Sequence, residues 1–157
     1  LGHVSINFEG PQCACGGRGC LECYASERAL LAYAREYAAR TGTAAPENWS
    51  DAISAAGTGD AACAAALERY CGYVAAALSN ALCLIDVHRV FVGYDGDGGG
   101  LLERLLEQRV NERLHIAGCR RITVRRSSFG SDASVYGAAA LAARCVFDGA
   151  FALPQRV

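Results

Sequence analysis

Three cysteines and one histidine near the start of the chain have the types and spacing of a metal site. Cys13, Cys15 and Cys20 lie close together in the run CACGGRGC, and His3 precedes them. Three thiolates and one imidazole suit tetrahedral Zn²⁺. The intervening glycines allow the backbone to turn back so that the three sulfurs converge. A closed set of four ligands leaves no open position, so we expect a structural zinc ion and no catalytic one.

Other interpretations of these four residues stay open. Cys13 and Cys15 are incidental in one of them. In another, two cysteines of the cluster form a disulfide, although neighbouring residues rarely reach disulfide geometry. A single histidine near the start of a strand is often only hydrogen-bonded, so spacing alone leaves His3 with either role.

The residues around the cluster indicate how it is positioned. Residues 3–8 alternate apolar and polar types, which is the period of a half-buried strand. Residues 9–20 hold proline, glycines and cysteines without hydrophobic periodicity, so they need a cross-link, such as a metal ion, to become ordered. Residues 21–40 have helical spacing, with a possible break near Ser26 and a stop at Gly42.

The remainder of the chain alternates helices and strands. Asp60 and Asp132 are suitable helix caps, and the small residues 137–139 suit close helix packing. The order of elements indicates an α/β layered domain. We expect helices over residues 51–56, 61–85, 101–114 and 134–147, and strands over residues 89–94 and around Ile122 and Val124.

Composition excludes several classes of function. The chain has 157 residues, of which 52% are hydrophobic, and this suits one globular domain. No lysine occurs, which excludes Schiff-base catalysis and the lysine of a P-loop. Methionine is absent even at position 1, so we expect the C-terminal part of a longer protein.

Charge, hydropathy and cysteine content indicate a cytoplasmic protein without a membrane partner. The net charge of -1 offers no general attraction for nucleic acid or anionic lipid. The longest uncharged run, residues 70–85, is shorter than the roughly 20 residues of a bilayer span. The nine cysteines cannot all pair internally, and five of them lie in Ala-rich or apolar segments as small hydrophobes. A reducing compartment suits them best.

Four arginines flank the short apolar strand around Ile122. Such a patch can contact DNA phosphate, but its only aromatic neighbour is Phe129, so a solvated sheet edge is the favoured interpretation. The four are Arg120, Arg121, Arg125 and Arg126.

A family signature is recognisable in the segment LGHVSINFEGPQCACGGRGCLECYAS. It closely resembles that of the ROK proteins (repressors, open reading frames and sugar kinases), in which a Gly-His pair is followed by Cys-x-Cys-Gly-x-x-Gly-Cys-x-Glu. LCLIDVHRVFVG resembles the family's helix and strand before its second glycine-rich loop, and SSFGSDASVYGAAALAA resembles its C-terminal helix entry. The resemblance implies a ribonuclease H-like (actin-like ATPase) C-terminal lobe over residues 1–157, with a zinc loop at 3–20 and helices and sheet at 21–157.

The resemblance also implies roles for individual residues. His3, Cys13, Cys15 and Cys20 fall on the family's zinc ligands, while His3 and Glu22 fall on positions that contact the hydroxyl groups of a bound sugar. A carboxylate accepts two hydroxyls, and a metal-bound imidazole has a second nitrogen for another. Without the resemblance, Glu22 is interpreted as a carboxylate favoured by a helix dipole, and both roles can hold together.

One departure from the pattern favours the family's transcriptional regulators. In its kinases the strand matching RVFVGY usually ends in a Gly-Gly pair beside the nucleotide. Here Gly93 is followed by Tyr94, Asp95 and Asp97, whose bulk and negative charge suit a triphosphate poorly. The family's phosphate loop and catalytic aspartate belong to an N-terminal lobe that is absent from this chain. We therefore expect no catalytic residue in it.

We expect the sugar-sensing and dimerisation part of a ROK-type transcriptional regulator, stabilised by zinc. Its partners would be a sugar or sugar-phosphate effector and further copies of itself, as a dimer or tetramer. DNA would be bound only through a domain absent here. The alternative is half of a ROK sugar kinase, which phosphorylates hexoses or N-acetylhexosamines with ATP. A third, weaker interpretation is a zinc-stabilised interaction module.

Overall fold

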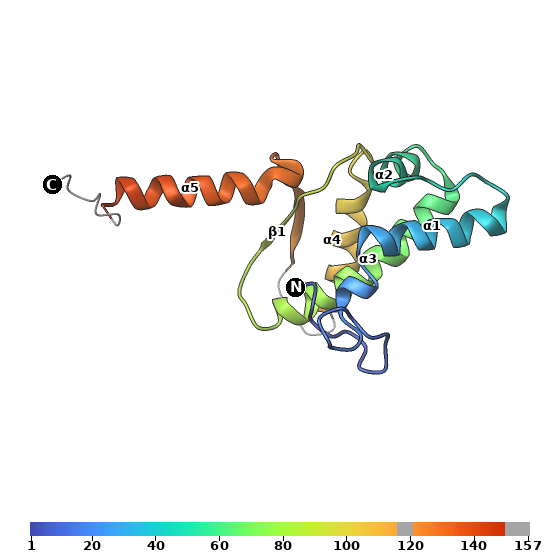
Figure 1. Ribbon diagram of the computed structural model, residues 1–157, viewed down its shortest axis with the longest axis horizontal. Coiled ribbons are helices and arrows are strands. Elements are labelled where there is room, and N and C mark those ends of the chain that lie inside the picture. The colour runs from blue at the N-terminus through green and yellow to red at the C-terminus, as the bar shows by residue number, and fades with distance from the viewer. Residues whose placement is uncertain (116–120, 150–157) are drawn as a thin grey trace.

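The computed structural model describes residues 1–115 and 121–149, so Cys119 and Arg120 lie outside the described residues. Helices dominate, and two short strands lie in the second half of the chain (Figure 1). The elements in chain order are η1 (Leu21–Cys23), α1 (Glu27–Thr41), α2 (Trp49–Gly57), α3 (Ala61–Leu82), β1 (Arg89–Val92), α4 (Leu101–His115), β2 (Thr123–Arg126), η2 (Gly130–Asp132) and α5 (Ala133–Phe147).

Three of the helices begin at side-chain caps. The side chain of Ser26 accepts a hydrogen bond from the backbone N–H of Ala29, which confirms the predicted break before α1. Asn48 caps α2 in the same way, and the Asp60 carboxylate accepts the N–H of Cys63 at 2.7 Å at the start of α3. These bonds satisfy donors that have no partner inside the helix.

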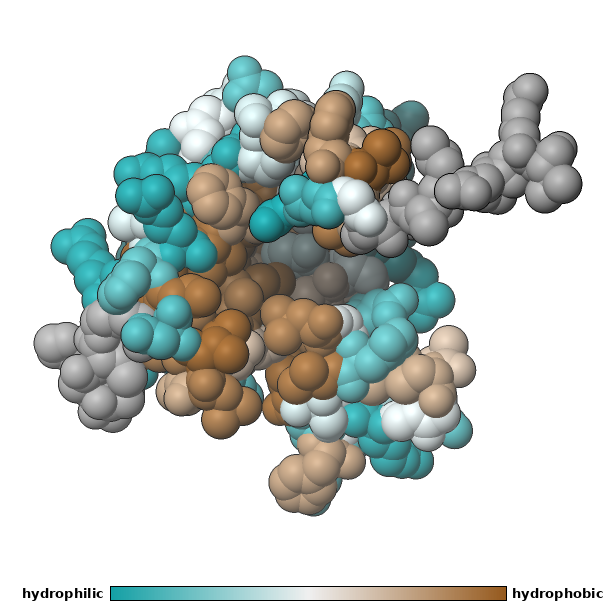
Figure 2. Space-filling model, turned by 90° about the vertical axis from the view of Figure 1, so that its left-hand side faces the viewer, coloured by the Kyte–Doolittle hydropathy of each residue, from teal (hydrophilic) through white to brown (hydrophobic). Residues whose placement is uncertain are grey.

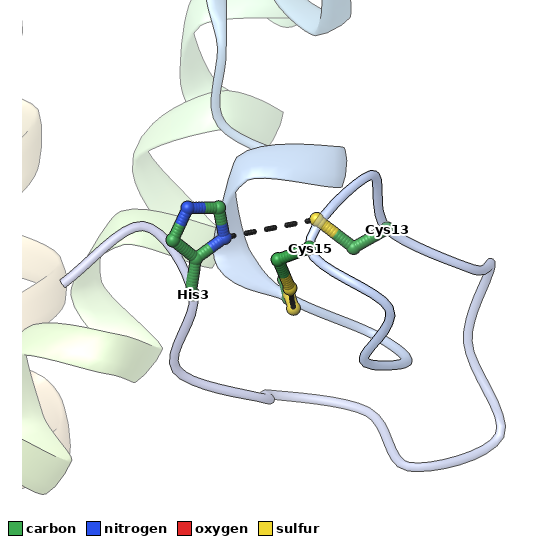
Figure 3. A group of neighbouring side chains, drawn as sticks. His3, Cys13 and Cys15 are labelled. Carbon is green, nitrogen blue, oxygen red and sulfur yellow. Dashed lines mark hydrogen bonds between the residues drawn. The ribbon is translucent and has the colours of Figure 1, made fainter.

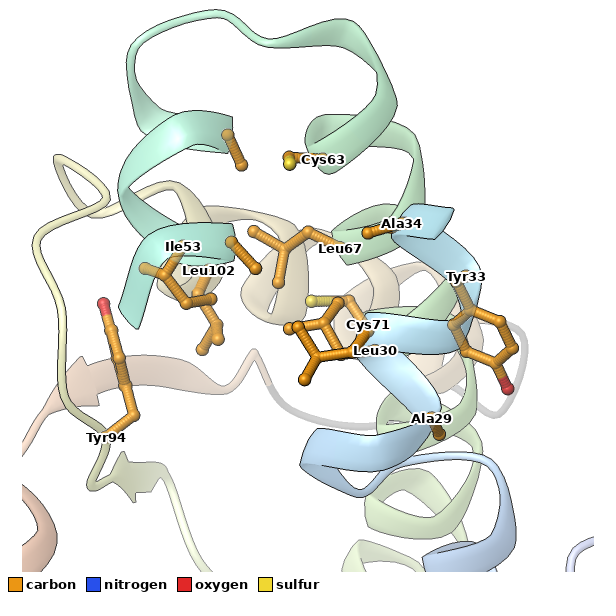
Figure 4. Close-up of a cluster of buried hydrophobic side chains, with 14 of the residues drawn as sticks. Ala29, Leu30, Tyr33, Ala34, Ile53, Cys63, Leu67, Cys71, Tyr94 and Leu102 are labelled. Carbon is orange, nitrogen blue, oxygen red and sulfur yellow. The ribbon is translucent and has the colours of Figure 1, made fainter. Parts of the chain in front are cut away.

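The main core forms where α3 packs against α1, α2 and α4. Leu30, Ile53, Leu67 and Cys71 project toward one another from α1, α2 and α3 and are at most 1% exposed (Figure 4). Alanines on α1 and α3 let the two helices approach closely, so the core is dense. Cys63 and Cys71 are buried as small hydrophobes, whereas Cys83 is exposed beyond the end of α3.

A two-stranded parallel sheet completes the α/β fold. β1 pairs with β2 in the register Arg89↔Thr123, and α4 forms the crossover between them. Ile122 and Val124 are buried, at 0% and 1% exposure. Arg121 and Arg125 are exposed at this edge, as the favoured interpretation of the basic patch predicts.

Side chains of α4 occupy the outer edge of β2. The Asn111 side-chain amide accepts the N–H of Ile122 at 2.9 Å and donates to the Ile122 carbonyl at 2.8 Å. The Glu107 carboxylate accepts the N–H of Val124 at 3.0 Å. α4 thus supplies the hydrogen bonds that a further strand would make, which protects the edge of the sheet.

Residues 3–8 do not form the predicted strand. Ser5 makes a single antiparallel bridge with Cys20, and the segment otherwise consists of turns and bends. Val4 is 42% exposed and Phe8 is 82% exposed, because no second strand lies beside them in the described chain to bury the apolar side of the alternation. The prediction failed since period-two alternation indicates a strand only where a pairing partner exists.

α5 extends away from the helical body (Figure 1). None of its residues is buried, so the close packing expected for residues 137–139 is not made within the described chain, and Asp132 makes no side-chain cap. Its apolar side chains Val135, Tyr136, Leu141 and Phe147 are exposed. Seen from the α5 side, apolar surface spreads over this face of the molecule (Figure 2). Such a surface marks an interaction site.

Within residues 1–115 and 121–149, no helix combines the length and hydropathy needed to span a bilayer.

We predict that the edge contacts of α4 stabilise the fold measurably. In Asn111→Ala the buried backbone of Ile122 loses both partners, which should lower the free energy of unfolding by about 1–3 kcal/mol. Gln108→Ala is the matched control, since the exposed Gln108 amide bonds only Glu112 on the same helix. Urea denaturation of both variants measures the difference. Equal stabilities would show that the edge bonds contribute nothing.

Candidate functional site

The N-terminal loop folds back on itself through backbone bonds. The N–H of Ile6 donates to the carbonyl of Gly19 at 2.9 Å, and the N–H of Cys13 donates to that of Gly17 at 2.8 Å. Gly19 has φ 63°, and a Cβ at this position would lie 1.6 Å from the carbonyl oxygen of Asn7. Only glycine allows this close crossing. The crossing returns the chain to the start of the loop and brings Cys20 beside the earlier cysteines.

The structure brings together the four side chains that the sequence indicated as metal ligands. One ligand atom from each of His3, Cys13, Cys15 and Cys20 lies within 4.8 Å of all the others. The Nδ1 atom of His3 is 3.7 Å from the sulfur of Cys13, and the sulfurs of Cys15 and Cys20 are 3.6 Å apart. Figure 3 shows the His3 ring directed toward the sulfur of Cys13, with Cys15 next to them. The described cysteines form no disulfide with one another.

The thiols of the cluster have very different acidities. A hydrogen bond from the backbone N–H of Cys15, followed by the contact with His3, lowers the pKa of Cys13 to about 6. Burial, followed by contacts with the neighbouring thiols, raises the pKa of Cys20 to about 12. The Cys13 thiolate therefore forms readily, whereas ionisation of Cys20 is opposed by desolvation and by the like charge of its neighbours. A bound cation would remove this opposition.

Glu22 lies on the other side of the His3 ring. Its carboxylate oxygen Oε2 is 3.5 Å from Nε2 of His3, and the two side chains are 56% and 61% exposed. Nδ1 thus faces the thiols while Nε2 faces Glu22 and solvent. The helix-dipole interpretation of Glu22 is weakened, because η1 is a single turn of three residues and α1 begins only at Glu27.

A fourth thiol adjoins the cluster, and the sequence reasoning did not assign it. Cys23 follows Cys20 by one 3-10 turn, with its N–H donating to the Cys20 carbonyl at 3.0 Å. Burial, followed by the contact with the Cys13 thiol, raises the pKa of Cys23, and both cysteines line one cavity beside α1. The Cys-x-x-Cys spacing of Cys20 and Cys23 could have indicated this thiol as a neighbour of the cluster. The family signature that the segment resembles, however, ends at Glu22.

The loop after β1 is filled by the ring of Tyr94. This side chain is only 6% exposed, and its hydroxyl donates to the Glu103 carboxylate at 2.8 Å. The guanidinium of Arg126 lies 4.4 Å from the ring centroid, and Trp49 meets the ring edge-on. Burial, followed by the Glu103 contact, raises the pKa of Tyr94 to about 12. Tyr94 is thus a core residue, whereas Asp95 and Asp97 are exposed.

Comparison with known proteins decides the family. The model of the ROK family matches residues 1–145. The chain belongs to the ROK family. Its relatives include both regulators and kinases, so membership alone leaves the activity of the whole protein undecided.

A repressor and a kinase are both similar to this chain in sequence. The xylose repressor of Bacillus subtilis (strain 168) is 37% identical over 82 residues, which cover 52% of this chain and 20% of the repressor. The N-acetylmannosamine kinase of Pasteurella multocida (strain Pm70) is 29% identical over 150 residues, covering 95% of this chain and 47% of the kinase.

Among solved structures, a ROK family glucokinase from Streptomyces griseus, in complex with glucose and AMPPNP, matches with a TM-score of 0.77 at 27% identity. The match covers 89% of this chain and 49% of the glucokinase. This likeness supports the α/β fold predicted from the sequence. The chain spans less than half the length of each of these relatives.

Proposed function

We propose that this chain is the sugar-sensing and dimerisation part of a ROK-type transcriptional regulator, stabilised by a structural zinc ion. The observation that carries the regulator proposal is the buried ring of Tyr94, which fills the loop where a nucleotide would need open backbone. The xylose repressor among the relatives supports the same assignment. DNA would be bound by a domain outside this chain.

The donor set favours zinc over other metals. Thiolate and imidazole ligands suit Zn²⁺, whereas Mg²⁺ and Ca²⁺ prefer oxygen. His3 would bind through Nδ1, since this atom faces the sulfurs, and Cys13, Cys15 and Cys20 would complete the set. When bound, the ion supplies a cross-link and charge compensation for three thiolates. Because Cys13 and Cys20 are buried, the site suits a structural ion.

The surface beside His3 is where we place the sugar. Nε2 of His3 and the Glu22 carboxylate lie side by side and exposed, so together they offer one hydrogen-bond donor and several acceptors to adjacent hydroxyl groups. A metal on Nδ1 fixes the ring tautomer with its proton on Nε2. The zinc would therefore act on the sugar indirectly, by holding the imidazole that contacts it.

The exposed apolar face of α5 supports a role in assembly. Val135, Leu141 and Phe147 are each more than half exposed, which is costly for a helix that contacts only water. We include this helix in the surface that joins the chain to other lobes or copies, as a dimer or tetramer.

A kinase is the second candidate, because the glucokinase from Streptomyces griseus shares the fold and the Pasteurella multocida kinase aligns with most of the chain. In that case the contacts to phosphate and metal would all come from the other lobe. Sugar binding at His3 and Glu22 would be common to both candidates.

We predict about one zinc ion per chain in the purified protein. Cys13→Ser should abolish binding, since it removes one of four ligands, while Cys145→Ser on the distant α5 should leave the content unchanged. Acidification should release the ion, because thiolates and imidazole then bind protons instead. Atomic emission measures the zinc at each pH. A zinc-free protein whose stability is unaffected by chelators would refute the assignment.

We predict that Glu22→Gln weakens sugar binding without affecting the zinc site. The Glu22 side chain is exposed and makes no contact that the core depends on, so the melting temperature and zinc content should stay nearly constant. Glu9→Gln in the same loop is the matched control. Calorimetric titration of the full-length protein with D-xylose, D-glucose and N-acetylmannosamine provides the readout. A loss of several kcal/mol in stability would instead identify Glu22 as a structural anchor.

We predict that the full-length protein does not transfer phosphate to sugars. It should release no ADP above background when incubated with ATP, Mg²⁺ and the same sugars plus other hexoses and N-acetylhexosamines. A ROK glucokinase assayed in parallel serves as the positive control. Turnover at roughly 1–100 per second, as is typical of kinases, would overturn the regulator proposal in favour of the kinase.

A further inference from the structure

A cavity of about 460 Å³ lies against the metal cluster on the side of α1. It is bounded by polar side chains and by two thiols, those of Cys13 and Cys23. Arg28 and Glu22 also line it. Small polar molecules from solvent can therefore enter beside both cysteines, although Cys13 itself is only 8% exposed.

Cys23 differs from the other thiols around it. The atoms that converge on a common point belong to His3, Cys13, Cys15 and Cys20, which leaves Cys23 outside the ligand set. Its thiol nevertheless contacts that of Cys13. A sulfur that is free of metal and adjoins a ligand sulfur is placed to form a disulfide with it, provided that an oxidant is available.

We propose that Cys23 is a resolving thiol, which lets peroxide open the zinc site by converting Cys13 and Cys23 into a disulfide. This inference rests on the zinc ion of the proposed function and adds an oxidant-sensitive regulation to it.

The reaction proceeds in two balanced steps. The Cys13 sulfur attacks one oxygen of the peroxide, the O–O bond breaks, and Cys13 becomes a sulfenic acid while the other oxygen leaves as water or alcohol. The Cys23 sulfur then attacks the Cys13 sulfur, the S–O bond breaks, and the hydroxyl leaves with the Cys23 proton as water. Two thiols are oxidised by two electrons in total, and one peroxide is reduced.

Disulfide formation removes one of the four metal ligands. With Cys13 no longer a thiolate donor, the remaining three hold zinc more weakly and the ion dissociates. His3 then loses the restraint on its Nδ1 side, and the pairing of Nε2 with Glu22 loosens. Oxidant would thus lower the response of the protein to sugar, and reduction of the disulfide would restore it.

The test compares zinc release from three zinc-loaded full-length proteins during treatment with hydrogen peroxide. These are the unaltered protein, Cys23→Ser, and Cys83→Ser, whose exposed thiol lies outside the cluster. The chelating dye 4-(2-pyridylazo)resorcinol reports the released zinc. We expect all three proteins to bind zinc and to release it with peroxide, but Cys23→Ser to regain severalfold less zinc after reduction, because its unresolved sulfenic acid oxidises further to sulfinic acid, while Cys83→Ser behaves as the unaltered protein. Cys23→Ala replaces the serine variant if that one fails to fold.

Peptide mapping identifies the bond itself. Trypsin cleaves after Arg18 and Arg28, so a Cys13–Cys23 disulfide joins the peptide that ends at Arg18 to residues 19–28. Fragmentation of the joined peptides distinguishes it from a Cys15–Cys20 bond. Equal recovery of zinc by the Cys23 variant after reduction, or a Cys15–Cys20 bond alone, would overturn the inference and leave the zinc site intact. Absence of zinc before oxidation would overturn the zinc assignment together with it.

Discussion

The convergence of the sulfurs at the start of the chain is the constraint on which the candidate site depends. Among residues 1–20 only four are buried, and these are Gly10, Cys13, Gly19 and Cys20. Two glycines and two cysteines supply almost no hydrophobic stabilisation, so little besides the backbone bonds of the loop opposes its conformational entropy. A metal ion held by them would therefore determine the conformation of the loop as well as that of its own ligands.

The helical body provides the fixed end against which this loop is held. Leu21 is 6% exposed and anchors η1 beside α3, directly after the last cysteine of the cluster. Tyr33 of α1 donates its hydroxyl to the Tyr24 carbonyl at 3.0 Å, and the ring of Tyr24 stacks on that of Tyr73. In the chain, Glu22 lies between the anchors Leu21 and Tyr24, and it follows the last cysteine of the cluster by two residues. Its position relative to His3 is thus set by the core on one side and by the sulfurs on the other.

Local sequence signals predicted most of the helices, because their causes are local. Asp60 caps the helix for which the sequence indicated it, and Ser26 caps α1 at the predicted break, whereas Asp132 makes no side-chain cap. The convergence of Cys13, Cys15 and Cys20 was also predicted from spacing, since the three lie within one short loop, whereas spacing alone did not decide the role of His3. The apolar alternation of residues 3–8 led to the wrong prediction of a strand, because the pairing of a strand depends on distant residues. The bonds of Asn111 to β2 and the contact of Cys23 with Cys13 are tertiary, and no periodicity reports them.

The side chains of α4 that cover β2 also determine at which edge of the sheet a further strand can pair. Both backbone groups of Ile122 and the N–H of Val124, which a neighbour of β2 would use, are already bonded by Asn111 and Glu107. Within the described residues, β1 has a strand on one side only, and Phe91 in it is 65% exposed. Any additional strand, whether from the same polypeptide or from another, must therefore add at β1. The sheet therefore has one open edge, at β1, because side chains of the crossover helix α4 cover the edge at β2.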